Sequence, residues 1–180
     1  MVRLQIMSDL HIELHDHIPS ASEYITPSAD VLILAGDIGR IHKYEQLKTF
    51  LKDLCKMFQI VLYVPGNHEF YKVDTVEPKS VEDLLEDLAK IKAEIPNLYI
   101  LNRSSVVIGN VCIAGCTLWT QSAVHVPQFI VRIKDIDTAI YNGMFCKDLK
   151  YIEQMITYCQ NKKLKLVMVT HHCPTHSVGR

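Results

Sequence analysis

Four short apolar runs stand out along the chain, separated by longer stretches of mixed polarity. They are RLQIM (3–7), VLILA (31–35), IVLYV (60–64) and LKLVMV (164–169). Each run is rich in Val, Ile or Leu and is bounded by polar or turn-forming residues, a pattern typical of strands buried in a sheet. We therefore predict four buried strands.

Apolar residues recur at helical spacing in three of the intervening stretches. The repeats are Leu47, Phe50, Leu51, Leu54 and Phe58; Val81, Leu84, Leu85, Leu88 and Ile91; and Leu149, Ile152, Ile156 and Cys159. Ser80 and Asp83 form a capping-box signature before the second repeat, and Pro96 limits its far end. Strands that alternate with helices predict an α/β fold.

The middle of the chain departs from this alternation. SSVVIGNVCIAGC (104–116) consists of two apolar runs joined by Gly109-Asn110, which is a signal for a two-residue hairpin turn. The sheet structure is therefore expected to be mixed. The segment 117–145 has weak periodicity, and we predict a long irregular excursion of the kind that often carries function.

Composition narrows the classes of protein that fit. The 180 residues suit a single domain spanning 1–180, with 48% apolar residues and a formal net charge of −1. No basic excess favours nucleic-acid binding, and no apolar stretch reaches the roughly 20 residues that cross a bilayer. The N-terminus lacks a secretory signal, so we expect a cytoplasmic protein with free thiols. A zinc pair at Cys112 and Cys116 is an alternative for two of the cysteines.

Polar residues follow each of the four apolar runs. The first runs into Asp9 and His11, the second into Asp37, the third into Asn67-His68-Glu69 and the fourth into His171-His172. In open α/β sheets, binding sites gather at the carboxyl ends of the strands. If the four strands are parallel neighbours, these side chains converge in one cleft.

The polar groups at these strand ends form a mixed nitrogen and oxygen ligand set without thiolate. Two carboxylates, two imidazoles and one amide come from Asp9, Asp37, His11, His171 and Asn67. Such a set suits manganese, iron or zinc. A cation, or two cations sharing one carboxylate, would also remove the repulsion between neighbouring carboxylates. A pair of such cations is a common clamp for displacement at phosphorus.

The motifs DLH, GD, GNHE and THH, in this order, resemble those of the calcineurin-like metallophosphoesterases. GCTLWT (115–120) is similar to a segment in one branch of small members, so the resemblance covers nearly the whole chain. It implies a sandwich of two mixed β-sheets flanked by helices, with two divalent metal ions (Mn, Fe or Zn) in the active site. A phosphorylated small molecule or nucleotide would be the substrate.

The resemblance also implies which residues hold the metal ions. Asp9 and His11 would bind one ion, Asn67 and His171 would bind the other, and Asp37 would bridge both. Water activated between the ions would attack phosphorus in line.

Three further residues receive supporting roles. By resemblance, His68 would contact the substrate phosphate and help to protonate the leaving group. Taken alone, it could instead orient Asp9 or Asp37 by a hydrogen bond. Glu69 would brace its loop, and His172 would be a hydrogen-bonding neighbour of the site.

One motif of the family has no counterpart in this sequence. A Gly-His-x-His follows the THHCP-like segment in the family, and the 180 residues contain none. We therefore expect a C-terminally incomplete domain in which each metal ion lacks one protein ligand and the second sheet has an exposed edge. The chain could be a short form or fragment, could be cut after Arg180, or could be completed by another chain. His176 could supply one ligand if its loop folds back.

This gap keeps other functional classes open. One is a non-catalytic binding or scaffold module of the same fold that self-associates through the exposed edge. Another is a nucleotide-binding α/β module, although no Gly-rich phosphate loop follows the first strand. Retention of the other ligand positions favours the hydrolase.

Overall fold

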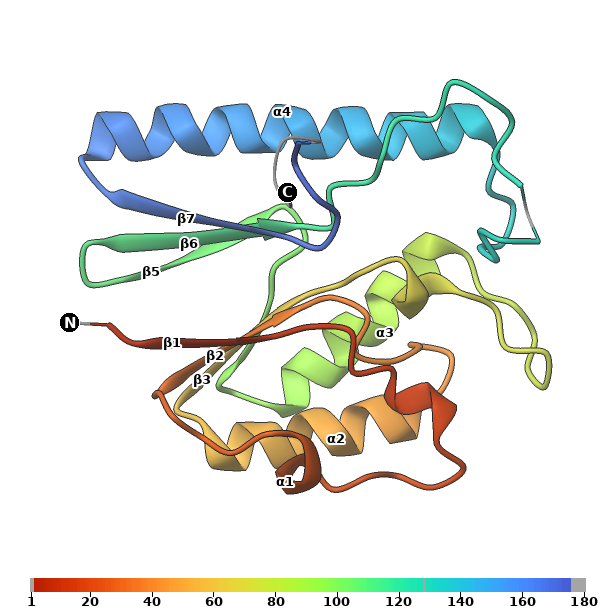
Figure 1. Ribbon diagram of the computed structural model, residues 1–180, viewed down its shortest axis with the longest axis horizontal. Helices are drawn as coiled ribbons and strands as arrows, with labels where there is room; N and C mark the ends of the chain where they lie inside the picture. The colour runs from red at the N-terminus through yellow and green to blue at the C-terminus, as the bar shows by residue number, and fades with distance from the viewer. Residues whose placement is uncertain (1, 128, 176–180) are drawn as a thin grey trace.

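The computed structural model describes residues 2–127 and 129–175, and within them the strands form two stacked sheets (Figure 1). Helices α2 (Tyr44–Met57) and α3 (Val81–Glu94) cover the outer side of the first sheet. Helix α4 (Thr138–Lys162) runs along the outer side of the second. The predicted sandwich of two sheets flanked by helices is confirmed. A short helix α1 (Ala21–Tyr24) and 3₁₀ turns at Ile12–Leu14 and His68–Phe70 complete the helical segments of the described chain.

The first sheet has the order β1-β2-β3-β4, and each neighbouring pair is parallel. Its strands are β1 (Leu4–Met7), β2 (Val31–Ala35), β3 (Ile60–Val64) and β4 (Leu98–Ile100). The central strands β2 and β3 coincide with the runs VLILA and IVLYV, because strands covered on both faces are continuously apolar. The sequence pattern missed β4, since three residues are too few to show a period.

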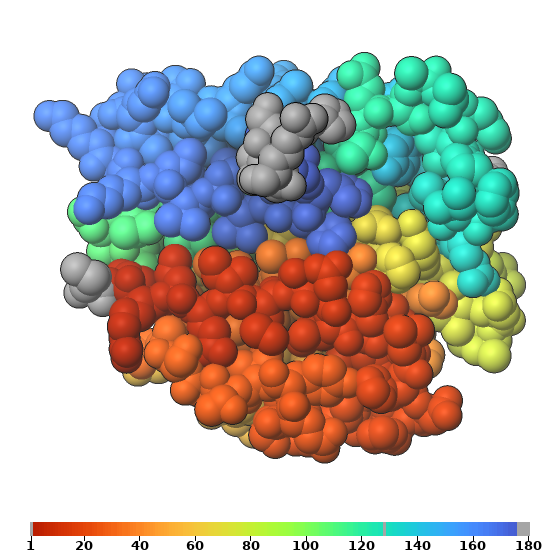
Figure 2. Space-filling model, in the orientation of Figure 1, coloured from red at the N-terminus to blue at the C-terminus, as the bar shows by residue number. Residues whose placement is uncertain are grey.

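The second sheet is mixed, with the order β5-β6-β7. Strands β5 (Ser104–Ile108) and β6 (Val111–Cys116) form the predicted hairpin, and Gly109 supplies the positive φ of 62° that its turn requires. Strand β7 (Lys165–Thr170) pairs in parallel with β6. The four apolar runs are therefore not all neighbours in one sheet, because β7 belongs to the second. The edge strands β1 and β7 lie against each other across one face of the molecule, where red meets blue in Figure 2.

Alternate residues of the central strands supply two different apolar layers. Leu32 and Leu34 of β2 face the helices of the first sheet, whereas Ile33 packs between the two sheets. Full burial of each such side chain stabilises the fold by roughly 1.5–3 kcal/mol. The sheets approach closely at Gly115, where a Cβ would lie 2.5 Å from Cγ2 of Val64.

Helix α4 begins earlier than the sequence pattern indicates. It starts at Thr138, so the last part of the predicted excursion 117–145 is helical and only 117–137 lacks a helix or strand in the described chain. The side chain of Asp137 caps the helix by accepting a hydrogen bond from the N–H of Ile140 at 2.7 Å. Of the helices in the described ranges, α4 included, none is long and apolar enough to cross a membrane.

Candidate metal centre and active site

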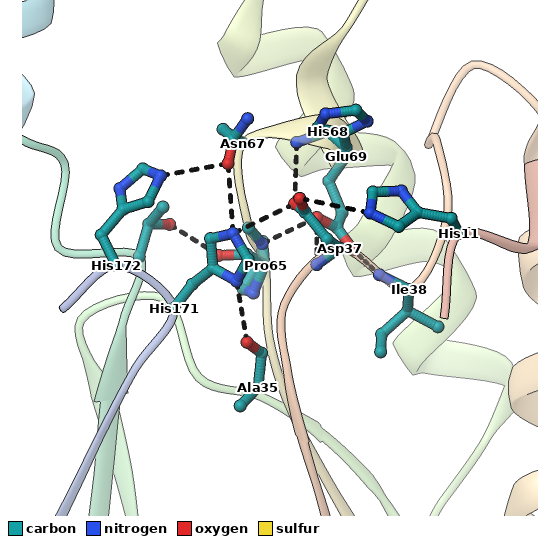
Figure 3. A network of polar contacts seen from close by, with 12 residues as sticks. His11, Ala35, Asp37, Ile38, Pro65, Asn67, His68, Glu69, His171 and His172 are labelled. Atoms are coloured by element: carbon teal, nitrogen blue, oxygen red, sulfur yellow. Dashed lines mark hydrogen bonds and ion pairs between the residues drawn. The ribbon is translucent and has the colours of Figure 1, made fainter. Parts of the chain in front are cut away.

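The carboxyl ends of β1, β2, β3 and β7 point to the same end of the molecule, although they belong to two sheets (Figure 1). Backbone pairing continues past the ends of β1 and β2. The N–H of Asp9 donates to the carbonyl of Gly36 at 3.0 Å, and the N–H of His11 donates to the carbonyl of Asp37 at 3.0 Å. These bonds bring Asp9 and His11 beside Asp37, which lies at the centre of the polar network in Figure 3.

Three of the predicted ligands have a left-handed backbone conformation. The φ angles are 56° at Asp9, 47° at His11 and 54° at Asp37. Non-glycine residues rarely adopt this region, and each instance costs on the order of 1 kcal/mol or more. Such strain concentrates at functional sites. The backbone therefore marks these strand ends as a site independently of the side-chain chemistry.

Two glycines allow the strand ends to approach each other. At Gly36, whose φ is 89°, a Cβ would lie 2.4 Å from Nδ1 of His171. At Gly66 a Cβ would lie 2.2 Å from Oδ1 of Asp37. Any side chain at either position would displace a predicted ligand, so both glycines are needed for the close approach.

Asp37 is the common neighbour of the imidazoles in the site. Its buried carboxylate accepts the backbone N–H of His68 at 2.9 Å and lies 3.3 Å from Nε2 of His171 and 3.9 Å from Nε2 of His11. Burial raises the pKa of Asp37, but the hydrogen bond and charge of His171 outweigh burial and leave the pKa below its usual value. The carboxylate is therefore ionised at neutral pH and available to a cation.

His171 and His172 present the same edge to the site. Nδ1 of His171 lies 2.9 Å from the carbonyl of Ala35, and Nδ1 of His172 lies 3.1 Å from the carbonyl of Leu118. Since a carbonyl oxygen only accepts, each Nδ1 carries the proton. Nε2 of each ring then faces Asn67.

The contact between His172 and Asn67 brings two acceptors together. Oδ1 of Asn67 lies 3.0 Å from Nε2 of His172 and 3.1 Å from Nε2 of His171, while its amide nitrogen donates to the hydroxyl of Tyr71 at 2.9 Å. Burial and the charge of His171 lower the pKa of His172, so that ring is neutral and its Nε2 has no proton to offer. A cation fits between such atoms, which makes His172 a further candidate ligand.

His171 differs from its neighbour in charge. Burial lowers its pKa, but the hydrogen bond and charge of Asp37 outweigh burial and raise the pKa to about 9. The protonated ring and the ionised carboxylate thus form an ion pair, and a metal ion bound by both groups would take the place of that proton.

Glu69 braces the loops that carry the ligands. Its fully buried carboxylate accepts the backbone N–H groups of Asp37 at 3.0 Å, Ile38 at 2.7 Å and Gly66 at 2.7 Å, and the hydroxyl of Tyr63 at 2.6 Å. Burial raises the pKa of Glu69, and the charge of Asp37 raises it further. One side chain therefore fixes the loop after β2 to the loop after β3.

The ring of His68 lies on the open side of the same loop. Its side chain is 32% exposed, and it stacks on Tyr71 with ring centroids 4.5 Å apart. Its Nδ1 lies 3.4 Å from Oε1 of Glu13 without meeting the geometry of a hydrogen bond, and the interaction with this carboxylate raises the pKa of His68 although burial opposes it. His68 is thus within reach of a molecule in the site, whereas Glu69 next to it is not.

The ionisable groups form two candidate metal-binding clusters that share Asp37. One contains His11, Asp37 and His68, the other Asp9, Asp37 and His171, and the ligand atoms of each cluster lie within 4.8 Å of one another. Asp9 therefore groups with His171 rather than with His11, its partner in the resemblance. Within the described residues no cysteine joins such a cluster, so the structure gives Cys112 and Cys116 no zinc site. His176 lies outside the described residues.

Glu13 is the site residue that the sequence reasoning missed. It is buried, and it contacts both His11 and His68. The signal available in the sequence was weak, namely a carboxylate two positions after His11 in the run DLHIE.

The fold and the site define a class, a two-sheet α/β sandwich with a candidate divalent-metal centre at its strand ends. The chain belongs to the calcineurin-like phosphoesterase family, whose model matches residues 2–179. A family relative, the uncharacterized protein L509 of Acanthamoeba polyphaga mimivirus, is 26% identical over 194 residues, which cover 97% of this chain and 69% of the relative.

Solved structures share the fold at low sequence identity. The phosphopantetheinyl hydrolase (PptH) of Mycobacterium tuberculosis superposes with a TM-score of 0.65 and 19% identity, covering 94% of this chain and 68% of that chain. A second solved chain gives a TM-score of 0.58 and 14% identity, covering 97% of this chain and 70% of its own. Membership of the family supports a phosphoesterase-type function, and the solved neighbours show the same fold.

Proposed function

We propose that this protein is a metal-dependent phosphoester hydrolase whose site holds two divalent cations. Asp37 would contact both ions, and Asp9, His11, Asn67 and His171 would complete the protein ligands. The observation that carries the proposal is the convergence of these groups on Asp37 at the ends of strands from two sheets. Divalent cations at such a site activate water as a nucleophile and stabilise the negative charge on phosphoryl oxygens.

The residues of the chain have separate tasks in this proposal. His68, which is partly exposed, contacts the phosphate and donates a proton to the leaving oxygen. Its backbone N–H holds the carboxylate of Asp37. Glu69 keeps the two ligand-bearing loops together, and His172 supports Asn67 or joins it as a ligand. The left-handed backbone at three ligands supports a hydrolase over a scaffold, because a scaffold gains nothing from that strain.

The substrate class in this proposal is a phosphorylated small molecule or nucleotide. The solved neighbour from Mycobacterium tuberculosis is a phosphopantetheinyl hydrolase, and that name is in keeping with a phosphorylated substrate. The fold carries the site but does not determine which chemical group is attached to the phosphate of the substrate.

The direct test is hydrolysis of an artificial phosphoester by the purified chain with Mn²⁺, Fe²⁺ or Zn²⁺. We expect metal-dependent turnover in the wild type and none in Asp37→Asn, which retains the shape of the side chain and removes its charge. The control is Asp74→Asn, which changes an 84% exposed carboxylate outside the site. Equal turnover in the wild type and Asp37→Asn would refute the proposal.

A further inference from the structure

Glu13 lies between two histidines of the site with its carboxylate almost completely buried. Its side chain is 2% exposed, and a single oxygen, Oε1, lies 3.1 Å from Nδ1 of His11 and 3.4 Å from Nδ1 of His68. The two imidazoles meet edge to face, with ring centroids 4.6 Å apart. Glu13 therefore contacts the same nitrogen of both rings, but the contact with His11 is a hydrogen bond, whereas Nδ1 of His68 has no hydrogen-bond partner in the described chain and interacts with the carboxylate only through charge.

Few positively charged groups or hydrogen-bond donors of the described chain lie near the carboxylate of Glu13. The guanidinium of Arg40 is at 3.9 Å from Oε1, and the ammonium of Lys43 donates at 2.7 Å to the backbone carbonyl of Glu13 rather than to its side chain. The second carboxylate oxygen, Oε2, is buried without a hydrogen-bond partner. Burying a carboxylate so incompletely paired costs stability. A role at the site gives a reason for retaining it.

A carboxylate that accepts a hydrogen bond from Nδ1 fixes the proton on that nitrogen. In a neutral imidazole the other nitrogen, Nε2, is then unprotonated and available as a ligand or proton acceptor. In His11, Nε2 is the atom that lies 3.9 Å from the carboxylate of Asp37. The contact with Glu13 thus leaves the site-facing nitrogen of His11 free.

We propose that Glu13 is a positioning residue that holds His11 with Nδ1 protonated and Nε2 directed to the candidate metal centre, and that its charge also favours a proton on Nδ1 of His68. For His11 this prepares a metal ligand, and for His68 it orients the ring that meets the substrate. The second part rests on the proposed hydrolase function, whereas the first requires only that the site binds a metal ion. Glu13 touches neither substrate nor metal ion in this role.

The first test uses the wild-type protein. Long-range ¹H–¹⁵N correlation spectra of the metal-free, ¹⁵N-histidine-labelled chain, recorded at alkaline pH, report which nitrogen of each ring carries the proton. Spectra of His11→Asn and His68→Asn assign the signals. We expect the Nδ1-protonated form for both rings. Imidazole in water prefers the Nε2-protonated form. Finding that form in both rings would overturn the proposal.

The second test replaces the carboxylate. Glu13→Gln should weaken Mn²⁺ binding, measured by calorimetry, by about 10–100-fold, the range for groups that orient metal-binding histidines. It should lower kcat by about tenfold or more with little change in KM. The rings of His11 and His68 should become a mixture of the Nδ1-protonated and Nε2-protonated forms. If Glu13→Gln does not fold, Glu13→Asp is measured in its place, because it retains the charge but withdraws the oxygens by one methylene.

The matched control is Asp87→Asn, the same loss of charge at a buried carboxylate outside the site. It should lower stability but leave Mn²⁺ affinity and kcat at wild-type values. Wild-type affinity and wild-type ring spectra in Glu13→Gln would overturn the proposal. If the wild type hydrolyses no phosphoester but Glu13→Gln alters affinity and ring protonation as expected, the hydrolase function fails and the positioning of His11 stands.

Discussion

The carboxylate of Glu69 accepts the backbone N–H of Asp37 at 3.0 Å, although the two residues lie on loops after different strands. The same carboxylate receives the N–H of Gly66 and the hydroxyl of Tyr63. The position of Asp37 thus depends on a buried side chain that has no access to solvent. This arrangement separates the groups that fix the site geometry from the groups that can meet a substrate.

Replacing Glu69 with Gln should therefore destabilise the protein strongly. The amide would turn one acceptor into a donor that faces backbone N–H groups, at a cost on the order of 3 kcal/mol. Urea denaturation gives the free energy of unfolding. The control Glu77→Gln, at an exposed position, should stay within about 0.5 kcal/mol of the wild type. Equal stability of the two variants would contradict the bracing role.

Gly66→Ala should disturb the metal centre through the backbone. The new Cβ would lie 2.2 Å from Oδ1 and 2.6 Å from the backbone nitrogen of Asp37, so this ligand must move. We expect a loss of about 1–3 kcal/mol in stability and of about tenfold or more in Mn²⁺ affinity, measured by denaturation and calorimetry.

The matched control for Gly66→Ala is Gly143→Ala. Gly143 lies within α4, and a Cβ there would meet nothing within 4 Å. Since alanine favours helix over glycine, this variant should be more stable than the wild type by up to about 1 kcal/mol, with unchanged metal affinity. Tight Mn²⁺ binding by Gly66→Ala would show that Asp37 is free to shift without loss.

Metal binding should stabilise the folded chain measurably. A cation that binds only the native state at 100 times its Kd adds about 2.7 kcal/mol, so Mn²⁺ should raise Tm in differential scanning calorimetry and EDTA should reverse the rise. Asp37→Asn removes the ligand shared by both clusters and should abolish the shift. A similar rise in Asp37→Asn would place the bound metal elsewhere on the protein.

Asp87 should contribute to stability in a pH-dependent way. Burial raises its pKa, but hydrogen bonds from Lys79 at 2.5 Å and Lys90 at 2.8 Å outweigh burial and lower it below 3.8. A lowered native pKa gives stability that is present above the unfolded-state pKa and is lost as the pH falls through the native value.

The comparison of wild type with Asp87→Asn tests that pH dependence. At neutral pH we expect the variant to be less stable by roughly 1 kcal/mol, because both lysines are partly exposed and solvent screens their charges. The difference in unfolding free energy should shrink below about pH 4, where the wild-type carboxyl also becomes protonated. If the difference in unfolding free energy stays constant from neutral to acid pH, Asp87 does not stabilise the protein through its charge.

The central strands were predictable because their signal is local. VLILA and IVLYV are buried on both faces, so each is apolar throughout and coincides with β2 and β3. The capping box at Ser80 and Asp83 was predictable for the same reason, and the structure contains both of its hydrogen bonds. The start of α4 was not predictable, because the apolar residues around Gly143 show only weak helical periodicity.

The candidate site was predictable from the sequence only for the residues at its strand ends. Asp9, Asp37 and His171 each follow an apolar run, so their placement follows from strand direction. The sequence could not show that β7 pairs with β6, since LKLVMV has the same pattern in either sheet. Nor could it show the role of Glu13, whose contact with His68 joins loops distant in sequence.

The origin of the candidate ligands in two sheets has a consequence for how the protein could lose the proposed metal centre. Asp9, His11, Asp37 and Asn67 follow strands of the first sheet, whereas His171 follows β7 of the second. The sheets are held together by side chains such as Ile33, Leu62 and Ile113, and by the close approach at Gly115. A partial opening that slides one sheet on the other would separate His171 from Asp37 while both sheets remain hydrogen-bonded. Loss of metal binding on heating or in denaturant would then precede the loss of secondary structure.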